Sequence, residues 1–274
     1  MRVLSLFDGM SCGQIALERA GIPVDEYYAC EIKPNAIKVT QENYPNTTQM
    51  GDVTKVSGSF LNIDLLIGGS PCQDLTSINL KGGGLKGKKS SLFFEYVRLL
   101  DECKPKYFLL ENVASMTNAD RDTISKHMGV EPIFINSKLL SAQERRRYYW
   151  TNIPVEQPED LGIKLSDVIS YGSDREESMS VKKYAHVEKK RLGTRYVRLD
   201  GDKSMPITAR SYASWNTQFV TDECGVRDLL LAEYKRLQTI PESYKFNCIK
   251  SKAVDLIGDG WTVDVIAHIF KGLR

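Results

Sequence analysis

Short apolar runs and longer amphipathic segments alternate through the first half of the chain. Residues 2–7 and 27–30 are apolar runs of strand length, whereas apolar residues recur at helical spacing over 11–20 and again after Pro34. Gly21 ends the first of these segments, and Pro34 suits the first turn of the second. The order strand–helix–strand–helix is typical of a parallel sheet whose strands are joined by crossover helices.

This alternation continues to about residue 151 and then weakens. Further strands are predicted at 64–67, 107–110, 132–135 and 148–151, with helices at 92–103 and 120–127. Helical spacing returns at 229–238, 250–257 and 263–270. We therefore predict an α/β fold, with a mostly parallel sheet flanked by helices, over 1–153. A small lobe or large insertion is expected over 154–225, and a C-terminal segment, 226–274, is expected to pack back on the core.

Composition places the chain among soluble globular proteins. It has 274 residues, of which 26% are charged and 42% hydrophobic, and a net charge of +2 that is too small to indicate a nucleic-acid partner. No apolar run approaches the roughly 20 residues of a membrane helix, and the first strand leaves no room for a signal peptide. The six cysteines include no Cys-x-x-Cys pair and the three histidines are scattered. These features predict a reduced, cytoplasmic protein without a metal site.

The turn after the first predicted strand is a candidate ligand site. It reads Phe7-Asp8-Gly9-Met10-Ser11-Cys12-Gly13, and Glu31 follows the second strand, where an acid can hold ribose hydroxyls. The turn lacks the G-x-G-x-x-G pattern for a pyrophosphate, so a nucleoside without a diphosphate, such as S-adenosylmethionine, fits better than NAD. Asp52, in a third such turn, could accept a hydrogen bond from an adenine amino group. The alternative is an ordinary turn with a solvated Glu31.

A second candidate site follows the strand predicted at 64–67. The loop Gly68-Gly69-Ser70-Pro71-Cys72-Gln73-Asp74 is stiffened by Pro71 and made approachable by its glycines. Cys72 is therefore held at the carboxyl end of a strand, where a thiol is a candidate nucleophile. A tight turn with an incidental cysteine explains this loop alone equally well. Glu111, at the end of the strand predicted at 107–110, could bind a substrate beside Cys72 or cap a turn.

Three basic stretches are candidates for contact with phosphates. The segment 81–90 is rich in glycine and lysine, and lysines and arginines with interleaved aromatics crowd 182–198. Between them, strand alternation would place Gln143, Arg145 and Arg147 on one side and Arg146 on the other. For each stretch the alternative is a solvated basic face or a flexible linker.

Taken in order, these motifs resemble those of the DNA (cytosine-5) methyltransferases, and most closely the de novo type of animals without its regulatory domains. The resemblance covers nearly the whole chain and is weakest from about 154 to 205. Its carriers are Leu6 to Gly9, Glu31, Gly51-Asp52-Val53, Gly68 to Asp74, Leu92 to Glu95, Glu111-Asn112-Val113, Gln143-x-Arg145-x-Arg147, Arg227 through Glu233 to Gln238, and Gly260 to Val263.

The resemblance implies a Rossmann-like, S-adenosylmethionine-dependent methyltransferase fold with a target-recognition region at 154–225. The implied catalytic residues are Cys72 as nucleophile, Glu111 at the cytosine edge, and Arg145 and Arg147 at the base and the Cys72 loop. The residues implied to surround S-adenosylmethionine are Phe7, Asp8, Gly9, Met10, Ser11, Cys12, Glu31, Ile32, Asp52, Val53, Gly69, Pro71, Gly260, Trp261 and Val263. The DNA contacts predicted from charge and position are Ser70, Gln73, Lys86, Lys88, Lys89, Gln143, Arg146, Lys182, Lys183, Lys189, Lys190, Arg191, Arg195, Arg198 and Arg210.

The implied activity is methyl transfer to carbon 5 of a cytosine flipped out of duplex DNA. Two alternatives remain at this point: the same chemistry on tRNA, and a DNA-binding homologue that has lost catalysis. We expect no membrane or metal partner, and a cytoplasmic location, at the nucleoid in a prokaryotic or viral setting. The sequence leaves open the target sequence, a restriction-enzyme partner, and whether the protein is a monomer or a homodimer.

Overall fold

A computed structural model describes residues 1–59, 61–71, 75, 84–87, 90–170, 198–212, 217–222 and 225–273. Its contacts divide the chain into two compact units. The first unit consists of Met1–Asn136, Arg146–Gln157 and Ile266–Arg274, and the second of Ser137–Arg145 and Pro158–Val265. The C-terminal segment predicted at 226–274 is thus divided between the two units. The boundary between the units lies between Val265 and Ile266, inside helix α8 (Val263–Phe270). The functional division into three parts stays a prediction.

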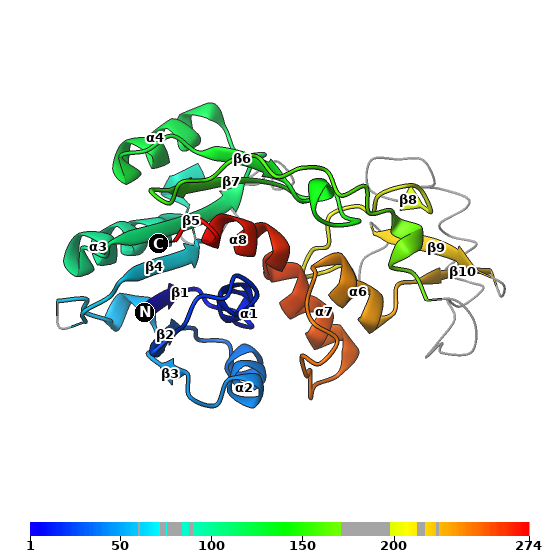
Figure 1. Cartoon of the computed structure of the whole chain (residues 1–274), viewed down its shortest axis with the longest axis horizontal. Helices are drawn as coiled ribbons and strands as arrows, with labels where there is room; N and C mark the ends of the chain where they lie inside the picture. The colour runs from blue at the N-terminus through cyan, green and yellow to red at the C-terminus, as the bar shows by residue number, and fades with distance from the viewer. Residues whose placement is uncertain are drawn as a thin grey trace. The chain divides into compact units, whose positions relative to one another are not determined.

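The first unit holds a seven-stranded sheet with the order β3-β2-β1-β4-β5-β7-β6, which Figure 1 shows from β3 at the bottom to β6 near the top. The strands are β1 (Arg2–Leu6), β2 (Glu26–Cys30), β3 (Thr48–Gln49), β4 (Leu65–Gly69), β5 (Tyr107–Val113), β6 (Ile133–Asn136) and β7 (Arg146–Thr151). Strands β1 to β5 are parallel, and β7 runs antiparallel to both β5 and β6. The predicted mostly parallel α/β sheet is confirmed.

The helices that accompany this sheet also match the predicted segments closely. They are α1 (Cys12–Arg19), α2 (Pro34–Asn43), α3 (Phe93–Cys103), α4 (Asn118–Met128) and α8 (Val263–Phe270). Leu4, Leu66 and Leu110 of neighbouring strands share a buried cluster with Tyr96 of α3 and Ile124 of α4. Because the alternate strand positions, such as those at 3, 65 and 109, are also 0% exposed, the sheet is covered on both faces.

The strand order places a switch point between β1 and β4. The connection after β1 leads to β2 on one side, whereas β4 pairs with β1 on the other side. In open α/β sheets, ligands bind outside the carboxyl ends of the strands at such a point. The two candidate turns, after β1 and after β4, therefore flank the position where this architecture binds ligands.

Among its described residues, the second unit contains a small sheet and two helices. Its elements are β8 (Arg198–Leu199), β9 (Gln218–Asp222), β10 (Gly225–Asp228), α6 (Leu231–Leu237) and α7 (Lys250–Asp259). The sheet has the order β10-β9-β8 and was not predicted from the sequence, because its short strands carry no clear alternation. Leu237 of α6 and Val254 and Ile257 of α7 are 0% exposed and form part of this unit's core.

Candidate active site

The loop after β1 has an unusual backbone. Phe7, Gly9 and Ser11 have φ values of 57°, 61° and 63°, in the left-handed region that residues other than glycine rarely adopt. Strain of this kind persists where surrounding structure enforces it, and it clusters at ligand sites. The N–H groups of Asp8, Gly9 and Ser11 are already donated to the Cys30 carbonyl, Glu31 Oε2 and the Asp8 carbonyl. The loop therefore has a backbone enforced by the protein, and these three N–H groups are not directed at a ligand.

Side chains beneath this loop hold it in place. The Ser11 hydroxyl donates to Asp8 Oδ2 (2.7 Å), and the Tyr27 hydroxyl donates to Asp8 Oδ1 (2.8 Å). The Gly9 N–H donates to Glu31 Oε2 (2.8 Å). Asp8 was predicted to touch the cofactor, but both of its oxygens accept hydrogen bonds from the protein. The structure gives its carboxylate a part in fixing the loop.

Glu31 is oriented by the chain that follows β2. Its Oε1 accepts the N–H groups of Ile32 (2.8 Å) and Lys33 (2.9 Å). The Ile32 side chain is 69% exposed, so an apolar surface adjoins a fixed carboxylate. Asp52 caps the short 3₁₀ turn Val53–Lys55, and hydrogen bonds from Thr54 lower the pKa of its carboxyl. A carboxylate, an apolar side chain and a second acid suit the ribose and base of a nucleoside.

Asp8 gives this loop a defined pH response. Burial raises the pKa of the Asp8 carboxyl from its usual 3.8 to about 6, although hydrogen bonds from Ser5, Ser11 and Tyr27 oppose the shift. The folded protein therefore binds this proton more tightly than the unfolded chain does. Stability contributed by protonated Asp8 is lost as the pH rises from 3.8 to about 6.

We expect Asp8→Asn to abolish this pH-dependent loss of stability. The free energy of unfolding of the wild type should therefore fall relative to that of the variant between pH 3.8 and about 6, and the difference between the two should be constant above pH 6. Urea unfolding at a series of pH values measures the difference. Asp52→Asn is the matched control and should show the opposite slope, because the pKa of Asp52 is lowered. A pH-independent difference for Asp8→Asn would contradict the assignment.

The loop after β4 is positioned by neighbouring elements. Gly69 lies opposite Glu111 in the parallel register of β4 and β5. The Asn112 amide donates to the carbonyl (3.1 Å) and the hydroxyl oxygen (3.0 Å) of Ser70, and the Ser90 hydroxyl donates to the Pro71 carbonyl (3.1 Å). The chain leading to Cys72 is thus fixed up to Pro71. Cys72 itself lies outside the described residues.

Glu111 and Arg147 form a partly buried ion pair across β5 and β7. The Arg147 Nε lies 2.6 Å from Glu111 Oε1, and their side chains are 15% and 11% exposed. The sequence pattern predicted Glu111 after its strand, but β5 continues to Val113, so its neighbours in the sheet fix the carboxylate. A charge-assisted hydrogen bond in such a setting holds both groups in one orientation. The site therefore brings an oriented carboxylate beside the loop that leads to Cys72.

The environments of two other cysteines make them poor nucleophiles. Burial raises the pKa of Cys30 to about 12, and burial also raises the pKa of Cys103. A thiol with a raised pKa carries little thiolate near neutral pH. Neither residue competes with Cys72 for the predicted role.

Gln143 and Arg145 lie in the second unit and Arg147 in the first, so the predicted common face for the three stays a prediction. The alternation rule applies only from Arg146, where β7 begins. Gln143 is 0% exposed, and its amide nitrogen donates to Leu237 O and Gln238 Oε1. Arg145 is 5% exposed and donates to backbone carbonyls of the second unit. Both side chains thus hydrogen-bond to groups of the protein itself, and their predicted contacts with a substrate stay predictions.

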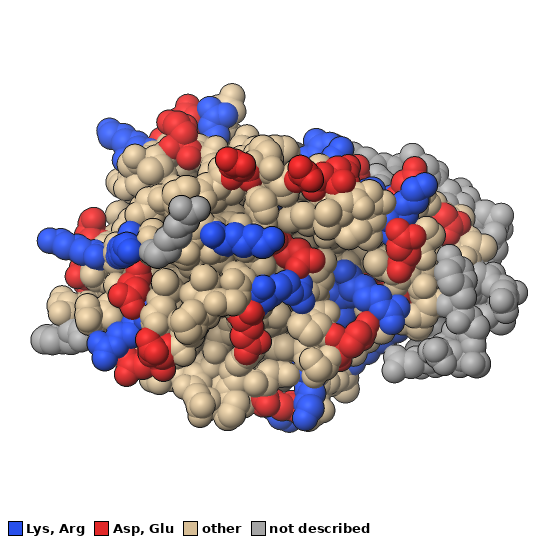
Figure 2. Space-filling view, viewed as in Figure 1, with Lys and Arg blue, Asp and Glu red and all other residues tan. Residues whose placement is uncertain are grey.

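The predicted DNA contacts have different outcomes in the structure. Arg146 and Arg210 are exposed, whereas Ser70 is 4% exposed and already accepts a hydrogen bond from Asn112. The side chains that lie outside the described residues are those of Gln73, Lys86, Lys88, Lys89, Lys182, Lys183, Lys189, Lys190, Arg191, Arg195 and Arg198. On the face shown in Figure 2, lysines and arginines are interspersed with acids rather than gathered in one patch. The DNA contacts stay predictions.

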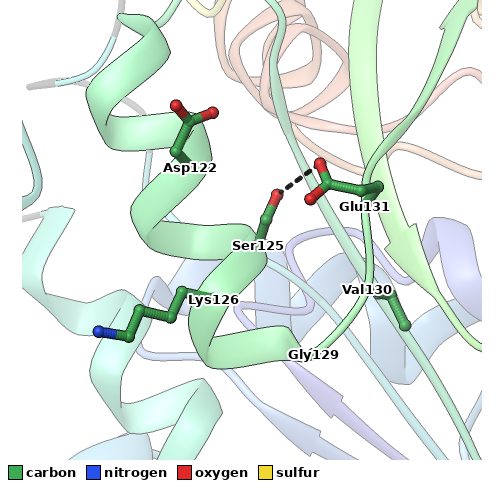
Figure 3. A pocket seen from close by; sticks show the side chains of 6 residues that line it. All are labelled: Asp122, Ser125, Lys126, Gly129, Val130 and Glu131. Carbon is green, nitrogen blue, oxygen red and sulfur yellow. Dashed lines mark hydrogen bonds between the residues drawn. The ribbon is translucent and has the colours of Figure 1, made fainter.

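A hollow of about 300 Å³ lies beside the C-terminal end of α4 (Figure 3). Asp122, Ser125, Lys126, Gly129, Val130 and Glu131 line it. The Ser125 hydroxyl donates to Glu131 Oε2 (3.4 Å) and accepts from Trp150 Nε1 (3.0 Å). None of the lining residues belongs to the predicted site, so the hollow is not the candidate active site.

Two further properties concern only the described part of the chain. It contains no cluster of three or more histidine, cysteine or acidic side chains arranged to hold a metal ion. It also contains no helix with the length and apolar character needed to cross a membrane.

Comparison with known proteins identifies the class. A family model described as C-5 cytosine-specific DNA methylase matches residues 1–160 and 136–274. The chain therefore belongs to the C-5 cytosine-specific DNA methylases. Enzymes of this family in general use S-adenosyl-L-methionine as the methyl donor.

The relatives differ in the fraction of their own length that aligns with this chain. The type II methyltransferase M.NgoBV of Neisseria gonorrhoeae is 30% identical over 211 residues, which cover 67% of this chain and 49% of that protein. The chain thus spans about half the length of that relative. The type II methyltransferase M.NlaX of Neisseria lactamica is 24% identical over the whole of this chain and 96% of its own.

A solved structure confirms the fold. The crystal structure of a Spodoptera frugiperda DNMT2 variant has a TM-score of 0.78 with 18% identity, and the match covers 99% of both chains. At this level of identity the likeness concerns architecture alone. The predicted Rossmann-like methyltransferase fold is confirmed.

Proposed function

We propose that this protein transfers a methyl group from S-adenosyl-L-methionine to carbon 5 of a cytosine in duplex DNA. The observation that carries the proposal is the Glu111–Arg147 pair beside the loop that leads to Cys72, since Gly69 and Glu111 are register partners. This geometry supplies an oriented carboxylate beside the chain that leads to the candidate nucleophile. Membership of the C-5 cytosine-specific DNA methylases supports the same reaction.

The reaction requires a nucleophile and a proton donor at different atoms of the cytosine ring. Carbon 5 of cytosine is a weak nucleophile, but addition of the Cys72 thiolate to carbon 6 makes the ring enamine-like and moves electron density to carbon 5. Negative charge then develops at ring nitrogen 3. Glu111 stands as a carboxylate in its pair with Arg147, so we propose that it takes up a proton from water when the cytosine enters and donates that proton to nitrogen 3. After methylation, water takes the carbon 5 proton, the bond between carbon 6 and the Cys72 sulfur breaks with its electron pair returning to sulfur, and the nitrogen 3 proton returns to Glu111, which restores the aromatic ring.

Arg147 and Asn112 support these two groups. Arg147 fixes the orientation of the Glu111 carboxyl, and Asn112 holds Ser70 two residues before Cys72. Holding reacting groups in place removes much of the entropic cost of the chemical step. We propose positioning roles for both residues, and no contact between Arg145 and the base.

The residues around the β1 and β2 ends fit S-adenosyl-L-methionine. We propose that the loop from Phe7 to Ser11 lies against the cofactor, that Glu31 holds the ribose hydroxyls, and that Ile32 and Asp52 meet the adenine. When bound, this cofactor supplies an electrophilic methyl group on a sulfonium. The family resemblance adds the turn at Gly260, Trp261 and Val263.

The remaining parts of the proposal concern DNA. The target base must leave the duplex, which costs a few kcal/mol in unstacking. Basic residues of 154–225 and of the 81–90 segment are proposed to offset this cost through phosphate contacts. We further propose a cytoplasmic location, at the nucleoid where the source is prokaryotic or viral.

A covalent trapping assay tests the function. The purified chain is incubated with S-adenosyl-L-methionine and a duplex pool of random sequence that contains 5-fluorocytosine, which blocks the final elimination. We expect a protein–DNA adduct that survives denaturing electrophoresis, and none with Cys72→Ala. Bisulfite sequencing of methylated, unmodified DNA then reports base and context. A chain that binds the cofactor yet gives neither adduct nor methylated DNA, or that methylates only tRNA, contradicts the proposal.

A further inference from the structure

In the second unit, Arg145 holds the turn that follows α7. Its Nη1 donates to the Ile207 carbonyl (2.6 Å), and its Nη2 donates to the carbonyls of Gly258 (3.1 Å) and Gly260 (2.9 Å). Arginine is suited to this task because its planar guanidinium offers several donors in fixed directions. One side chain therefore joins the turn at 258–260 to the distant segment at Ile207.

Two glutamines complete the same hydrogen-bond network. Gln238 Nε2 donates to the carbonyls of Ile257 (2.9 Å) and Gly260 (3.2 Å), while its Oε1 accepts from Gln143 Nε2 (3.1 Å). Gln143 Oε1 accepts the Ile207 N–H (2.7 Å). Ile207 is thus held through its N–H by Gln143 and through its carbonyl by Arg145. These buried polar groups specify one arrangement of the turn, because any group that loses its partner stays buried and unsatisfied at a cost in free energy.

Backbone packing joins the same two segments. A Cβ placed on Gly258 would lie 2.2 Å from the Thr208 carbonyl carbon and 2.4 Å from the Ala209 nitrogen. Such distances leave no room for any side chain, so the backbone at 207–209 lies directly on the end of α7. Hydrogen bonds and close packing therefore couple the segment 207–209 to the turn at 258–261.

We infer that Arg145 is a positioning residue that shapes the turn at 258–261 for the cofactor. We also infer that it couples cofactor binding to target recognition through the segment 207–209. The turn at Gly260 and Trp261 is proposed to contact S-adenosyl-L-methionine, and 207–209 belongs to the proposed target-recognition region, so the inference rests on the proposed function. The guanidinium sets the shape of the turn and transmits changes at 207–209 to it. By linkage, DNA then changes the affinity for the cofactor by the same factor as the cofactor changes the affinity for DNA, and the inference includes that each strengthens the other.

Arg145→Met tests the inference, because methionine keeps much of the volume and loses the three hydrogen bonds. We expect the Kd for S-adenosyl-L-methionine, measured by calorimetry on the full chain, to rise about tenfold or more, and the strengthening of this binding by duplex DNA to fall by about fivefold. With both substrates saturating, kcat should change by less than about threefold, the signature of a binding contribution. Arg145→Lys should recover part of the affinity. Lys252→Met, an exposed site on α7, is the matched control and should behave as wild type.

If the variants do not fold, hydrogen–deuterium exchange on the wild-type chain tests the inference by measuring how the cofactor changes the protection of backbone amides. Adding the cofactor should protect amides at 207–211 as well as at 258–263. Protection confined to 258–263, or an unchanged Kd in folded Arg145→Met, overturns the inference and leaves the proposed function standing. If the wild-type chain methylates DNA and Arg145→Met lowers only kcat, the inference is overturned, and a direct contact between Arg145 and the cytosine base is supported instead. A wild-type chain that binds no cofactor overturns the proposed function and the inference together.

Discussion

Replacing Glu111 with glutamine is expected to lower kcat for methyl transfer by about 10²–10⁴-fold, the range for loss of a positioned acid or base. Glutamine matches the shape of glutamate but cannot give a proton to ring nitrogen 3. It also cannot form the ion pair with Arg147, whose Nε lies 2.6 Å from Glu111 Oε1. The charge that develops on the ring after Cys72 adds to carbon 6 is then left without its stabilising partner.

Single-turnover transfer of a labelled methyl group to DNA measures this effect apart from binding. The Kd for S-adenosyl-L-methionine should change by less than about threefold, because Glu111 is not proposed to touch the cofactor. Glu131→Gln is the matched control, since Glu131 is exposed and lies beside the separate hollow at α4. A kcat for Glu111→Gln close to that of wild type would show that Glu111 is not the proton donor to ring nitrogen 3.

The largest loss of stability is expected from Glu233→Gln. Arg227 and Glu233 are 1% and 0% exposed, and their two hydrogen bonds are both 2.9 Å long. Breaking a buried pair by removing one charge costs about 3–5 kcal/mol, because the partner is left buried and uncompensated. Glu233 also accepts the N–H groups of Leu230 (2.7 Å) and Ser170 (2.8 Å), so the variant disturbs the start of α6 and the chain near 170 as well.

Urea unfolding followed in the second unit measures this loss, and two variants sharpen it. Asp255→Asn removes the partner of Lys252 on the solvent side of α7 and should cost less than about 1 kcal/mol, as surface pairs do. The double variant Arg227→Met with Glu233→Leu leaves no buried charge and should recover much of the stability lost by Glu233→Gln. Equal costs for Glu233→Gln and Asp255→Asn would show that burial does not determine the cost of losing the Arg227–Glu233 pair.

Much of the first unit was predictable because its signals are local. Apolar runs marked β1, β4 and β5, amphipathic spacing marked α3 and α4, and glycine or proline marked the turns between them. A parallel sheet gathers the carboxyl ends of its strands, so the turns after β1 and β4 were placed correctly at one edge of the sheet, and their role as ligand loops stays a prediction. The order and spacing of the motifs were also sufficient to predict the family, which the family model confirms.

Other features depend on contacts between residues far apart in the chain. Asp8 accepts a hydrogen bond from the Tyr27 hydroxyl of β2, and Glu111 meets Arg147 only because β7 runs antiparallel to β5. The β8–β10 sheet is set by pairing between short strands that carry no strong periodicity. None of these contacts is encoded in the spacing of neighbouring residues.

The run from Gln143 to Arg147 separates the two kinds of information. By itself the sequence determined the residue types, their spacing and the presence of a strand near 148, since these follow from local polarity. Only the tertiary structure decided that β7 begins at Arg146, so that Arg147 meets Glu111 while Arg145 turns to the carbonyls at 207, 258 and 260. The physical reason is that side-chain alternation holds only within a strand, and long-range hydrogen bonding fixes where that strand starts.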